Sequence, residues 1–299
     1  MSFAESAGMR LRQAIEEERP LQVAGAINAF CARLAERTGF RAIYLSGAGV
    51  ANASYGLPDL GMTSLDNVLT DVGRITAVTD LPLLVDADTG WEDDSSIAHT
   101  TREMIRAGAA GMHIEDQVPA KRCGHRAGKT LVSAEEMATR ISAACEARTF
   151  DDFVIMARTD AAANEGVAAA IGRSLKYIEA GADMIFAEAL TDLEQYRQFT
   201  RAVSVPVLAN LTEFGRTSLF SLDEMRSAGV RLVLYPLSAF RAMSAAAVRV
   251  YEELRQHGTQ QGVLELMQTR EELYEILDYD THEQRIDQLL KKDDKHEQR

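Results

Sequence analysis

Eight short apolar runs alternate with longer stretches of helical periodicity along most of the chain. The runs are nearly unbroken and rich in valine and isoleucine, which is typical of strands buried on both faces of a parallel sheet. They lie at residues 22–26, 42–45, 81–88, 111–116, 153–160, 184–188, 205–212 and 231–237. Eight strand–helix repeats favour a (β/α)8 TIM barrel over a doubly wound sheet. We therefore expect an α/β protein with one barrel domain over residues 1–299.

Glycine and proline mark the boundaries between these segments. Glycines end the helix-like segments before the second, fourth, sixth and eighth runs, and they are Gly39, Gly108, Gly181 and Gly229. Glycine at such a point fits the left-handed position that follows a helix. Prolines start the third and seventh runs, where a missing backbone donor is tolerated.

The periodicity also predicts helices outside the barrel repeats. Residues 6–19 form an amphipathic pattern at the N-terminus, and three further helical patterns cover 238–256, 259–268 and 269–277. The tail, about 279–299, is highly charged, and we expect it to be frayed or disordered.

Polar residues gather at the carboxyl ends of the apolar runs, whereas the beginnings of the runs are apolar or small. In a barrel, these ends and the loops after them form one rim, where active sites lie. The polar residues at these ends are Asn28, Ser46, Asp86, Asp88, Glu115, Asp116, Arg158, Asp160, Glu188, Asn210 and Thr212. Because random surface polarity would not select one end of nearly every strand, the pattern predicts an enzyme.

Net charge, apolar content and cysteine count indicate which partners and which cellular compartment to expect. A net charge of −13 argues against nucleic acid or an anionic membrane surface as partners. No apolar stretch approaches the ~20 residues of a membrane span, and we see no secretion signal, so we expect a soluble protein. Three cysteines without framework spacing favour a reducing compartment, the cytoplasm. Of these, Cys31 and Cys145 resemble small residues packed in helices.

Asp86 and Asp88 end the third run two residues apart, so strand alternation points both carboxylates to one face. Two oxygen ligands with positions left for water and substrate suit Mg²⁺. A helix-capping pair at a strand–loop junction is the alternative. Glu115 on the next strand favours the metal, and no histidine pair has the spacing of zinc ligands. Asp59 either joins the metal's water shell or simply occupies a turn.

The segment Lys121-Arg-Cys-Gly-His-Arg follows the fourth run. A thiol between cations and an imidazole is in a setting that favours the reactive thiolate. Gly124 lets the backbone turn closely around whatever the cysteine faces. A solvated basic loop with an incidental cysteine is the alternative.

Two further features lie on neighbouring strands. His113 shares a strand face with Glu115, and we expect a buried hydrogen-bonding residue there rather than a catalyst. The turn Ser46-Gly47-Ala48-Gly49 exposes backbone N–H groups suited to a carboxylate, although a short glycine turn alone is weak evidence.

The cysteine segment, together with Asp86-Ala-Asp88, Glu115-Asp-Gln and Tyr44-Leu-Ser-Gly, resembles the isocitrate lyase/phosphoenolpyruvate mutase superfamily over about residues 21–274. The compact length is most similar to its methylisocitrate-cleaving members. The resemblance implies Mg²⁺-dependent cleavage of (2S,3R)-2-methylisocitrate to pyruvate and succinate, in the methylcitrate cycle of propionate breakdown. It also implies a homotetramer whose last barrel helix swaps between subunits.

The resemblance assigns roles to residues at matching positions. Asp86 and Asp88 would hold Mg²⁺, with Asp59 and Glu115 reaching it through water. Cys123 would protonate the departing succinate carbanion, with His125 and Glu115 setting its state and Arg158 balancing charge. Tyr44 or a water on the metal would take the hydroxyl proton. Residues implied to bind the di- or tricarboxylate substrate are Ser46, Gly47, Ala48, Cys123, Gly124, Arg158, Glu188, Asn210, Leu211, Thr212, Arg241 and Arg270.

Three positions depart from the superfamily's usual glycines: Ala48, Glu92 and Pro119. The fixed φ of Pro119 would change how the cysteine loop closes, which bears on kinetics and specificity rather than on the reaction class. A related lyase acting on isocitrate, 2,3-dimethylmalate or oxaloacetate is the first alternative. A catalytically silent binding barrel is the second, and it predicts gaps in the rim set that the sequence does not have.

Overall fold

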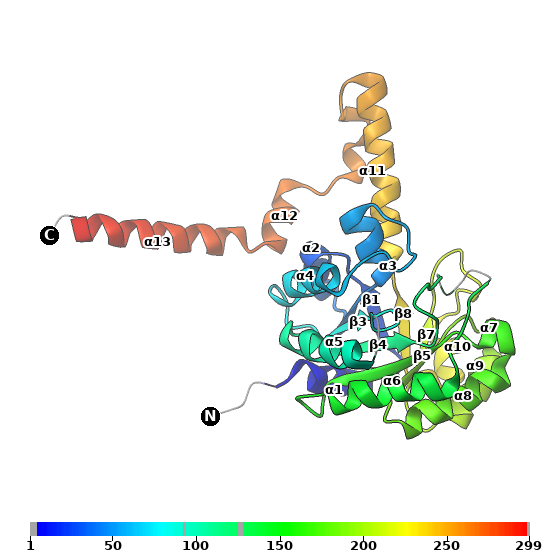
Figure 1. The fold of residues 1–299 in the computed structure, drawn as a ribbon. Coiled ribbons are helices and arrows are strands. Elements are labelled where there is room, and N and C mark those ends of the chain that lie inside the picture. Colours follow the sequence, from blue (N-terminus) through cyan, green and yellow to red (C-terminus); the bar gives the residue numbers. More distant parts are fainter. Residues whose placement is uncertain (1–4, 92–93, 123, 125–127, 298–299) are drawn as a thin grey trace. The chain divides into compact units, whose positions relative to one another are not determined.

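The structure is a computed structural model that describes residues 5–91, 94–122, 124 and 128–297. The chain divides into two compact units, Met1–Phe240 and Arg241–Arg299, and each is described by itself. In the first unit, eight parallel strands close into a barrel in sequence order (Figure 1). The strands are β1 (Leu21–Gly25), β2 (Ala42–Leu45), β3 (Leu83–Asp86), β4 (Gly111–Glu115), β5 (Val154–Thr159), β6 (Met184–Ala187), β7 (Val207–Asn210) and β8 (Leu232–Tyr235). The predicted (β/α)8 barrel is confirmed.

Helices cover the outside of this barrel, and their apolar faces pack against the outward-facing strand residues in one continuous core. They are α2 (Ala29–Arg37), α4 (Leu65–Thr76), α5 (Asp94–Arg106), α6 (Ala134–Glu146), α7 (Ala162–Glu165), α8 (Val167–Glu179), α9 (Leu193–Ala202) and α10 (Leu222–Ser227). The short helix α3 (Gly47–Gly49) and the π-helical turn η1 (Val50–Ser54) follow β2 at one end of the barrel. Cys31 on α2 is buried and Cys145 on α6 is half-buried, as predicted.

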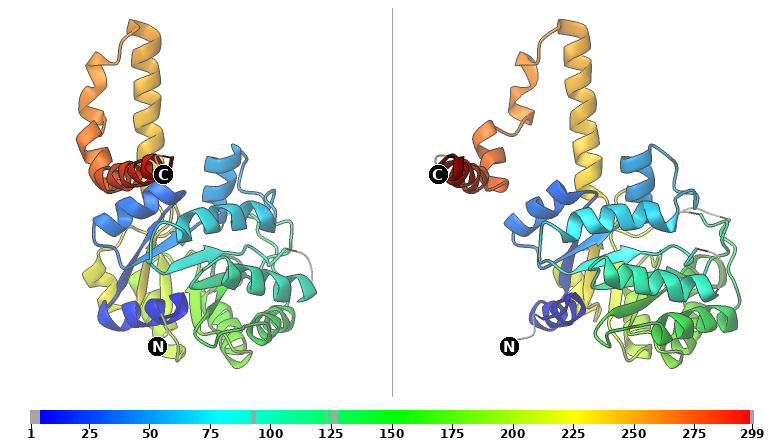
Figure 2. Two further views of the ribbon diagram at one scale, coloured as in Figure 1. Left: turned by 90° about the vertical axis from the view of Figure 1, so that its left-hand side faces the viewer. Right: turned by 60° about the vertical axis from the view of Figure 1, so that its left-hand side comes forward.

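The N-terminal helix α1 (Ala7–Glu17) closes one end of the barrel. Its residues Leu11, Ala14 and Ile15 are buried in a second core with inward-facing strand residues such as Leu21 and Leu232. Figure 2 shows α1, in dark blue, at the end of the barrel opposite α3 and η1. The strands' carboxyl ends therefore form the open rim.

The boundary residues behave as the sequence predicts. The four glycines ahead of the even-numbered strands all have positive φ, with values of 90°, 87°, 109° and 80°. Pro82 lies directly before β3, and its carbonyl accepts a hydrogen bond from Ile43 N–H at 3.1 Å. Asn28 lies in the loop after β1, and its side chain caps α2 by accepting from Cys31 N–H at 2.9 Å.

The second unit contains most of α11 (Ser238–His257), the 3-10 turn η2 (Gln261–Leu266), α12 (Arg270–Ile276) and α13 (Tyr279–Glu297). The predicted helix over 259–268 is therefore only a short 3-10 turn. The charged tail, predicted to be frayed, is helical as α13, with exposed side chains over residues 279–290. Disorder of residues 279–299 in solution and a single domain over residues 1–299 stay predictions.

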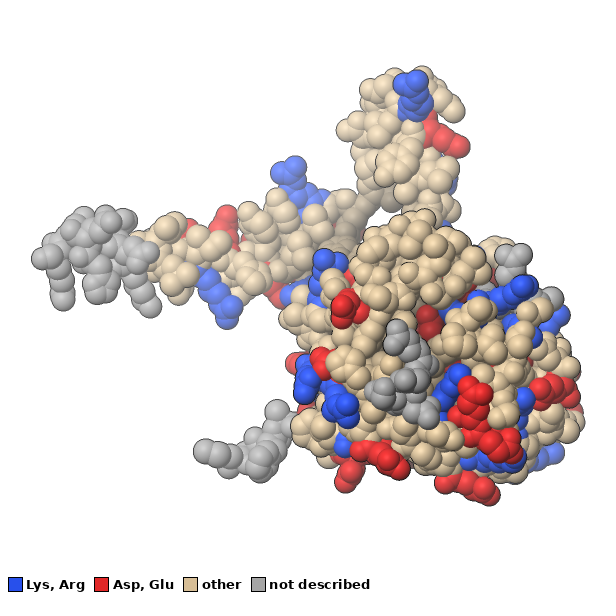
Figure 3. Space-filling view, in the orientation of Figure 1, with Lys and Arg blue, Asp and Glu red and all other residues tan. Residues whose placement is uncertain are grey.

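Two surface properties bear on partners. Figure 3 shows acidic and basic side chains interspersed over the visible face of the barrel, so neither sign forms one broad patch there. Among the described residues, no helix combines the length and apolar content needed to cross a lipid bilayer.

Candidate active site

Asp86 and Asp88, the predicted metal ligands, converge on the backbone of Gly47. Asp86 ends β3, and Asp88 follows in a left-handed conformation with φ of 48°. A Cβ built on Gly47 would lie 3.0 Å from Asp88 Oδ1 and 3.2 Å from Asp86 Oδ2. The N–H of Gly47 donates to Asp86 Oδ2 at 3.0 Å, and the N–H of Asp88 donates to Asp86 Oδ1 at 3.0 Å. Both carboxylates are buried, so they form one anionic site at the rim.

Lys121 reaches this site from the loop after β4. Its Nζ lies 2.7 Å from Asp59 Oδ1 and forms an ion pair with Asp88. Burial lowers the pKa of Lys121, but Asp88 and Glu115 outweigh this and hold that pKa well above its usual value. Sequence reasoning grouped Lys121 with the cysteine, whereas the structure places it on the carboxylates.

The two aspartates titrate in opposite directions. Burial raises the pKa of Asp88 to about 7, against the opposing charge of Lys121. Burial acts in the same sense on Asp86, but His113, Lys121 and Arg158 outweigh it, so the pKa of Asp86 is lowered. Asp86 is therefore ionised over the whole physiological range, whereas Asp88 titrates within it.

His113 and Tyr44 form a buried pair beside Asp86. The strand register places His113 opposite Asp86, and the Tyr44 hydroxyl lies 2.8 Å from His113 Nε2. Burial lowers the pKa of His113 to about 4, so this imidazole is neutral at pH 7. Burial, with the charge of Asp86, raises the pKa of Tyr44 well above its usual value. His113 is thus a buried hydrogen-bonding residue, as predicted, and Tyr44 keeps its proton.

Glu115 and Arg158 stand opposite each other in the register of β4 and β5. Arg158 Nη1 lies 3.2 Å from Glu115 Oε2, and Arg158 Nε lies 3.7 Å from Glu188 Oε2. Both Glu115 oxygens are buried and accept no hydrogen bond among the described residues. Burial raises the pKa of Glu115 well above its usual value, and the charge of Arg158 opposes that shift. Glu115 is therefore a carboxylate held at the rim without the hydrogen bonds that usually stabilise one.

Gly124 of the cysteine loop is buried against the same cluster. A Cβ built there would clash with the Arg158 guanidinium and lie 2.8 Å from Glu188 Cδ. Only glycine fits this close approach. Cys123 and His125, the predicted thiol acid and its neighbour, lie outside the described residues.

The remaining predicted substrate residues fall into two groups. Ser46, Gly47 and Ala48 follow β2, and Asn210, Leu211 and Thr212 end and follow β7, so these six belong to the rim. Asn210 Nδ2 donates to Glu188 Oε2 at 3.3 Å. Arg241 lies on α11 and Arg270 begins α12, both in the second unit, so their assignment stays a prediction.

Asp116, at the same strand end as Glu115, belongs instead to a hydrogen-bonded network. It accepts from Thr159 Oγ1 at 2.8 Å, from Tyr177 hydroxyl at 2.9 Å and from the N–H of Asp160 at 2.9 Å. These bonds join β4, β5 and α8 below the rim. Asp116 therefore braces the barrel and offers no open acceptor to a ligand.

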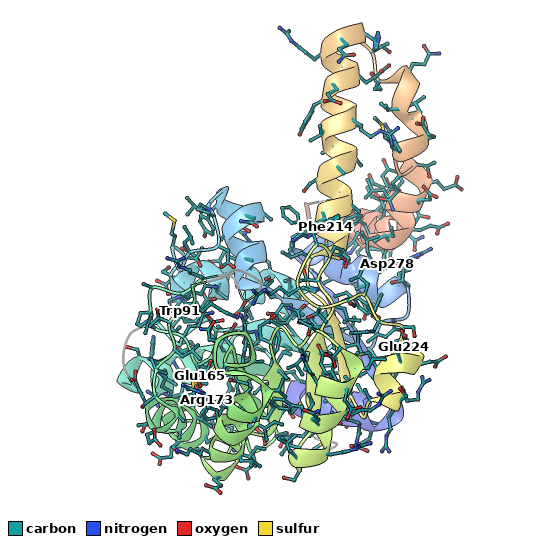
Figure 4. All side chains as sticks on the ribbon, turned by 90° about the vertical axis from the view of Figure 1, so that its right-hand side faces the viewer. Trp91, Glu165, Arg173, Phe214, Glu224 and Asp278 are labelled. Carbon is teal, nitrogen blue, oxygen red and sulfur yellow. The ribbon has the colours of Figure 1, made fainter. Side chains whose placement is uncertain are left out.

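A cavity of about 450 Å³ opens beside Asp88 and Lys121. Its lining includes Trp91, which Figure 4 labels in the loop after β3, and Pro119, one of the unusual positions in the cysteine loop. Trp91 Nε1 donates to the carbonyl of Thr63 at 2.9 Å. The cavity leaves room for a small ligand next to the predicted metal ligands.

Two charged residues to which the sequence assigned no role meet next to Arg158. Lys129 Nζ lies 2.6 Å from Asp160 Oδ1 and donates to the carbonyl of Gly124 at 2.6 Å. Asp160 Oδ2 in turn accepts from Arg158 Nε at 3.0 Å. Both side chains of the Lys129–Asp160 pair are 0% exposed. The partners lie 31 residues apart, so local spacing carries no signal for their contact.

The donor set fits Mg²⁺. Within the described ranges, no three Asp, Glu, His or Cys side chains come together closely enough to hold an ion by themselves. Asp86 and Asp88 would therefore need water and substrate oxygens to complete a shell, which is how Mg²⁺ is usually bound. The unsatisfied oxygens of Glu115 suit a hydrogen bond from a water of that shell. An all-oxygen set favours Mg²⁺ over zinc.

The chain is similar to known proteins over most of its length. The family model described as phosphoenolpyruvate phosphomutase matches residues 11–255. The 2-methylisocitrate lyase of Escherichia coli (strain K12) is 60% identical over 286 residues, covering 95% of this chain and 97% of the relative. The 2-methylisocitrate lyase of Shewanella oneidensis is 58% identical over 291 residues, covering 97% and 100%. The crystal structure of a 2,3-dimethylmalate lyase superposes with a TM-score of 0.88 at 34% identity, covering 95% of each chain.

Proposed function

The chain belongs to the phosphoenolpyruvate mutase/isocitrate lyase superfamily and is an enzyme of lyase type, and from that premise we propose that it cleaves (2S,3R)-2-methylisocitrate to pyruvate and succinate with Mg²⁺. The observation that carries the proposal is the convergence of Asp86 and Asp88 on Gly47, beside Lys121. Such a site suits an α-hydroxy-carboxylate bound through a divalent ion. The high identity to two 2-methylisocitrate lyases supports this substrate.

The reaction breaks the bond between the carbinol carbon and its carboxylate-bearing neighbour. The hydroxyl loses its proton, and the electron pair on its oxygen forms the carbonyl of pyruvate. The pair of the broken C–C bond stays on the succinate fragment until a proton reaches it. We assign that proton to the Cys123 thiol, with His125 and Glu115 setting the state of the thiol. For Cys123 and His125 this assignment is supported by the sequence motif alone.

Asp86 and Asp88 would hold the Mg²⁺, and Asp59 and Glu115 would contact its water shell. When bound, the ion supplies positive charge that lowers the free energy of the deprotonated hydroxyl. Lys121 adds a second cation to the same carboxylates. An anionic substrate can therefore approach this acidic protein.

The base for the hydroxyl proton follows from the state of Tyr44. Because the pKa of Tyr44 is raised, its phenol is protonated at neutral pH and donates a hydrogen bond more readily than it accepts a proton. This favours a water molecule, the other base considered from the sequence. Tyr44 would then orient the substrate hydroxyl or that water.

Arg158 supplies fixed positive charge on the other side of the site. Burial lowers the pKa of Arg158, but Asp160, Glu115 and Glu188 outweigh this and raise the pKa well above its usual value. A guanidinium held by several carboxylates loses little entropy when a further carboxylate binds. We assign it to a substrate carboxylate and to the charge that develops on the succinate fragment.

The substrate is tested with the purified chain and Mg²⁺. 2-Methylisocitrate, isocitrate, 2,3-dimethylmalate and oxaloacetate are supplied separately, and kcat/KM is measured from release of the oxo-acid product or, for oxaloacetate, of oxalate. We expect the highest value for 2-methylisocitrate. A higher value for one of the others would replace the substrate, and no cleavage of any would overturn the proposal.

The thiol acid is tested with Cys123→Ser. We expect loss of cleavage with nearly intact binding of Mg²⁺ and substrate, measured by calorimetry. Cys145→Ser, at a half-buried position on α6, is the matched control and should retain full turnover. Unchanged turnover of Cys123→Ser refutes the role of the thiol.

We extend the proposal to a cytoplasmic homotetramer in which α11 is exchanged between subunits. Exposed apolar residues on α11 support it, because Val248, Tyr251 and Leu254 are 53%, 70% and 41% exposed in a single chain. Large exposed apolar side chains on one helix mark an interaction surface. Light scattering of the purified protein should give four times the mass of the chain.

A further inference from the structure

Lys129 is a completely buried lysine at the base of the cysteine loop. Its Nζ lies 2.6 Å from Asp160 Oδ1 and donates to the carbonyl of Gly124 at 2.6 Å. Its own carbonyl accepts from Asn164 Nδ2 at 2.9 Å, which fixes the residue against α7. Lys129 therefore ties the loop backbone at Gly124 to the end of β5.

The flanks of the loop are tied separately. The side chain of Gln117 binds both backbone groups of Arg122, donating to its carbonyl at 2.9 Å and accepting from its N–H at 3.0 Å. Val118 N–H donates to the carbonyl of Thr130 at 3.0 Å, so the two ends of the loop run side by side. These bonds fix where the loop begins and ends, but they do not reach Gly124.

Gly124 packs against Arg158 and Glu188, two residues proposed to bind the substrate. A Cβ there would clash with Arg158 and come within 2.8 Å of Glu188 Cδ. Asp160 holds Arg158 with two hydrogen bonds, of 3.0 and 3.2 Å, while it also binds Lys129. One carboxylate thus sets the position of Arg158 and, through Lys129, the position of the loop.

A purely structural role explains this arrangement less well. A buried ion pair contributes little net stability, because desolvation of both charges offsets their attraction. What the pair does add is one defined placement of the Gly124 carbonyl. We propose that Lys129 and Asp160 are positioning residues of the lyase: they hold Gly124, which follows Cys123 in the sequence, against Arg158 and Glu188, the residues assigned to the substrate. The inference rests on the proposed function for its kinetic test.

The first test replaces Lys129 by methionine, which keeps the length and removes the charge. Lys176→Met, at a half-exposed lysine paired with Glu135 on the surface, is the matched control. We expect kcat for 2-methylisocitrate to fall about 10- to 100-fold in Lys129→Met, since a misplacement of about 1 Å has effects of that size. KM and Mg²⁺ binding should match the control, whereas the unfolding temperature should fall, because Asp160 stays buried with one cation fewer beside it.

A lower unfolding temperature with wild-type kcat in the folded fraction would show a structural role and overturn the inference. If Lys129→Met does not fold, Lys129→Gln replaces it. Its amide retains a donor for the Gly124 carbonyl but loses the ion pair with Asp160, so kcat should fall less than the 10-fold minimum given for Lys129→Met and still below the Lys176→Met control; kcat equal to the control would overturn the inference.

A double-mutant cycle tests the route through Asp160. Asp160→Asn should lose more activity than Lys129→Met, because Arg158 also loses its partner. If Lys129 acts through Asp160, the double variant should lose no more than Asp160→Asn alone. Independent, multiplicative losses in kcat would overturn the proposed connection.

A measurement without turnover separates this inference from the proposed function. Alkylation of Cys123 by iodoacetamide, followed by mass spectrometry of its peptide, reports on the loop even if none of the four substrates is cleaved. We expect a severalfold change in the alkylation rate in Lys129→Met and none in Lys176→Met. Equal rates in both variants would overturn the positioning role, whatever the substrate proves to be.

Discussion

Glu115 and Asp116 are consecutive acidic residues at the end of β4, and the structure treats them in opposite ways. Both are 0% exposed. Asp116 accepts three hydrogen bonds from Thr159, Tyr177 and the backbone of Asp160. Glu115 accepts none among the described residues, and the Arg158 guanidinium lies 3.2 Å from its Oε2.

The difference assigns a stabilising role to Asp116 and a chemical role to Glu115, although the two residues are adjacent in the sequence. Hydrogen bonds from surrounding donors to a carboxylate lower the free energy of the folded state. The same donors occupy its oxygens, so the carboxylate is not available to a ligand. A buried carboxylate without donors raises the free energy of the folded state. Such a group is typical of a site where a ligand, water or ion supplies its missing partners. The side of the strand on which each residue lies decides which of the two it becomes.

Glu115→Gln gives the largest expected effect. We expect kcat/KM to fall about 100-fold or more, because the neutral amide cannot set the charge state of the thiol or accept from two water molecules. The free energy of unfolding, measured in urea, should change by less than about 1 kcal/mol, since no hydrogen bond is lost. Activity within twofold of wild type would contradict the chemical role assigned to this side of β4.

Gly124→Ala tests the close approach of the loop to the Arg158 side. The added methyl group clashes with Arg158 and Glu188, so we expect kcat to fall about 10- to 100-fold. Gly73→Ala, on α4 with open space around it, is the matched control. That control should keep full activity and gain about 0.5–1 kcal/mol of stability. Equal activities of the two variants would contradict the placement of Gly124.

His113 shares the Glu115 face and predicts an acid-specific effect. Its pKa is about 4 when folded and about 6.5 when exposed, so below pH 6.5 the unfolded chain binds a proton that the folded chain does not. Stability present above pH 6.5 is therefore lost as the pH falls through 4, by at most about 3 kcal/mol. His113→Gln should lose less over this range in urea unfolding with EDTA. Parallel losses in both proteins would argue against a neutral buried imidazole.

Asp116→Asn should show the reverse of Glu115→Gln. The amide cannot accept from all three donors, so we expect a loss of about 1–3 kcal/mol in the free energy of unfolding. kcat should fall less than in Glu115→Gln, because Asp116 lies on the opposite side of β4, where Tyr177 of α8 donates to it. Thermal unfolding and turnover of the two variants, measured side by side, test the comparison directly. A stable but inactive Asp116→Asn would reverse it.

The barrel and the rim could be predicted from the sequence because their signals are local. Apolar runs, left-handed glycines such as Gly39 and the Asp86-Ala-Asp88 pair all lie within a few residues. The same reasoning could not separate Glu115 from Asp116, since hydrogen-bond donors from β5 and α8 make the difference. It did not predict that Asn28, in the loop after β1, caps α2, because the signals of a strand end and a helix start coincide there.

Long-range contacts account for what the sequence did not predict. Lys121 was grouped with its sequence neighbour Cys123, yet its ammonium binds Asp59 and Asp88 on other loops. Lys129 had no predicted role, because its partner Asp160 becomes a neighbour only when β4 and β5 pair.

The helix α1 has a consequence for the opposite end of the molecule. Leu11 and Ile15 of α1 close the amino-terminal end of the barrel, so the site at the other end lies above an apolar interior of low permittivity. The electric field of the charges at the carboxyl ends of the strands is therefore not screened by solvent from the α1 side, and it extends mainly out of the open rim. The buried carboxylates Asp86, Asp88, Glu115 and Glu188 outnumber Lys121 and Arg158 at this rim, so it would attract a divalent cation first, and an incoming tricarboxylate would be drawn in by that bound ion.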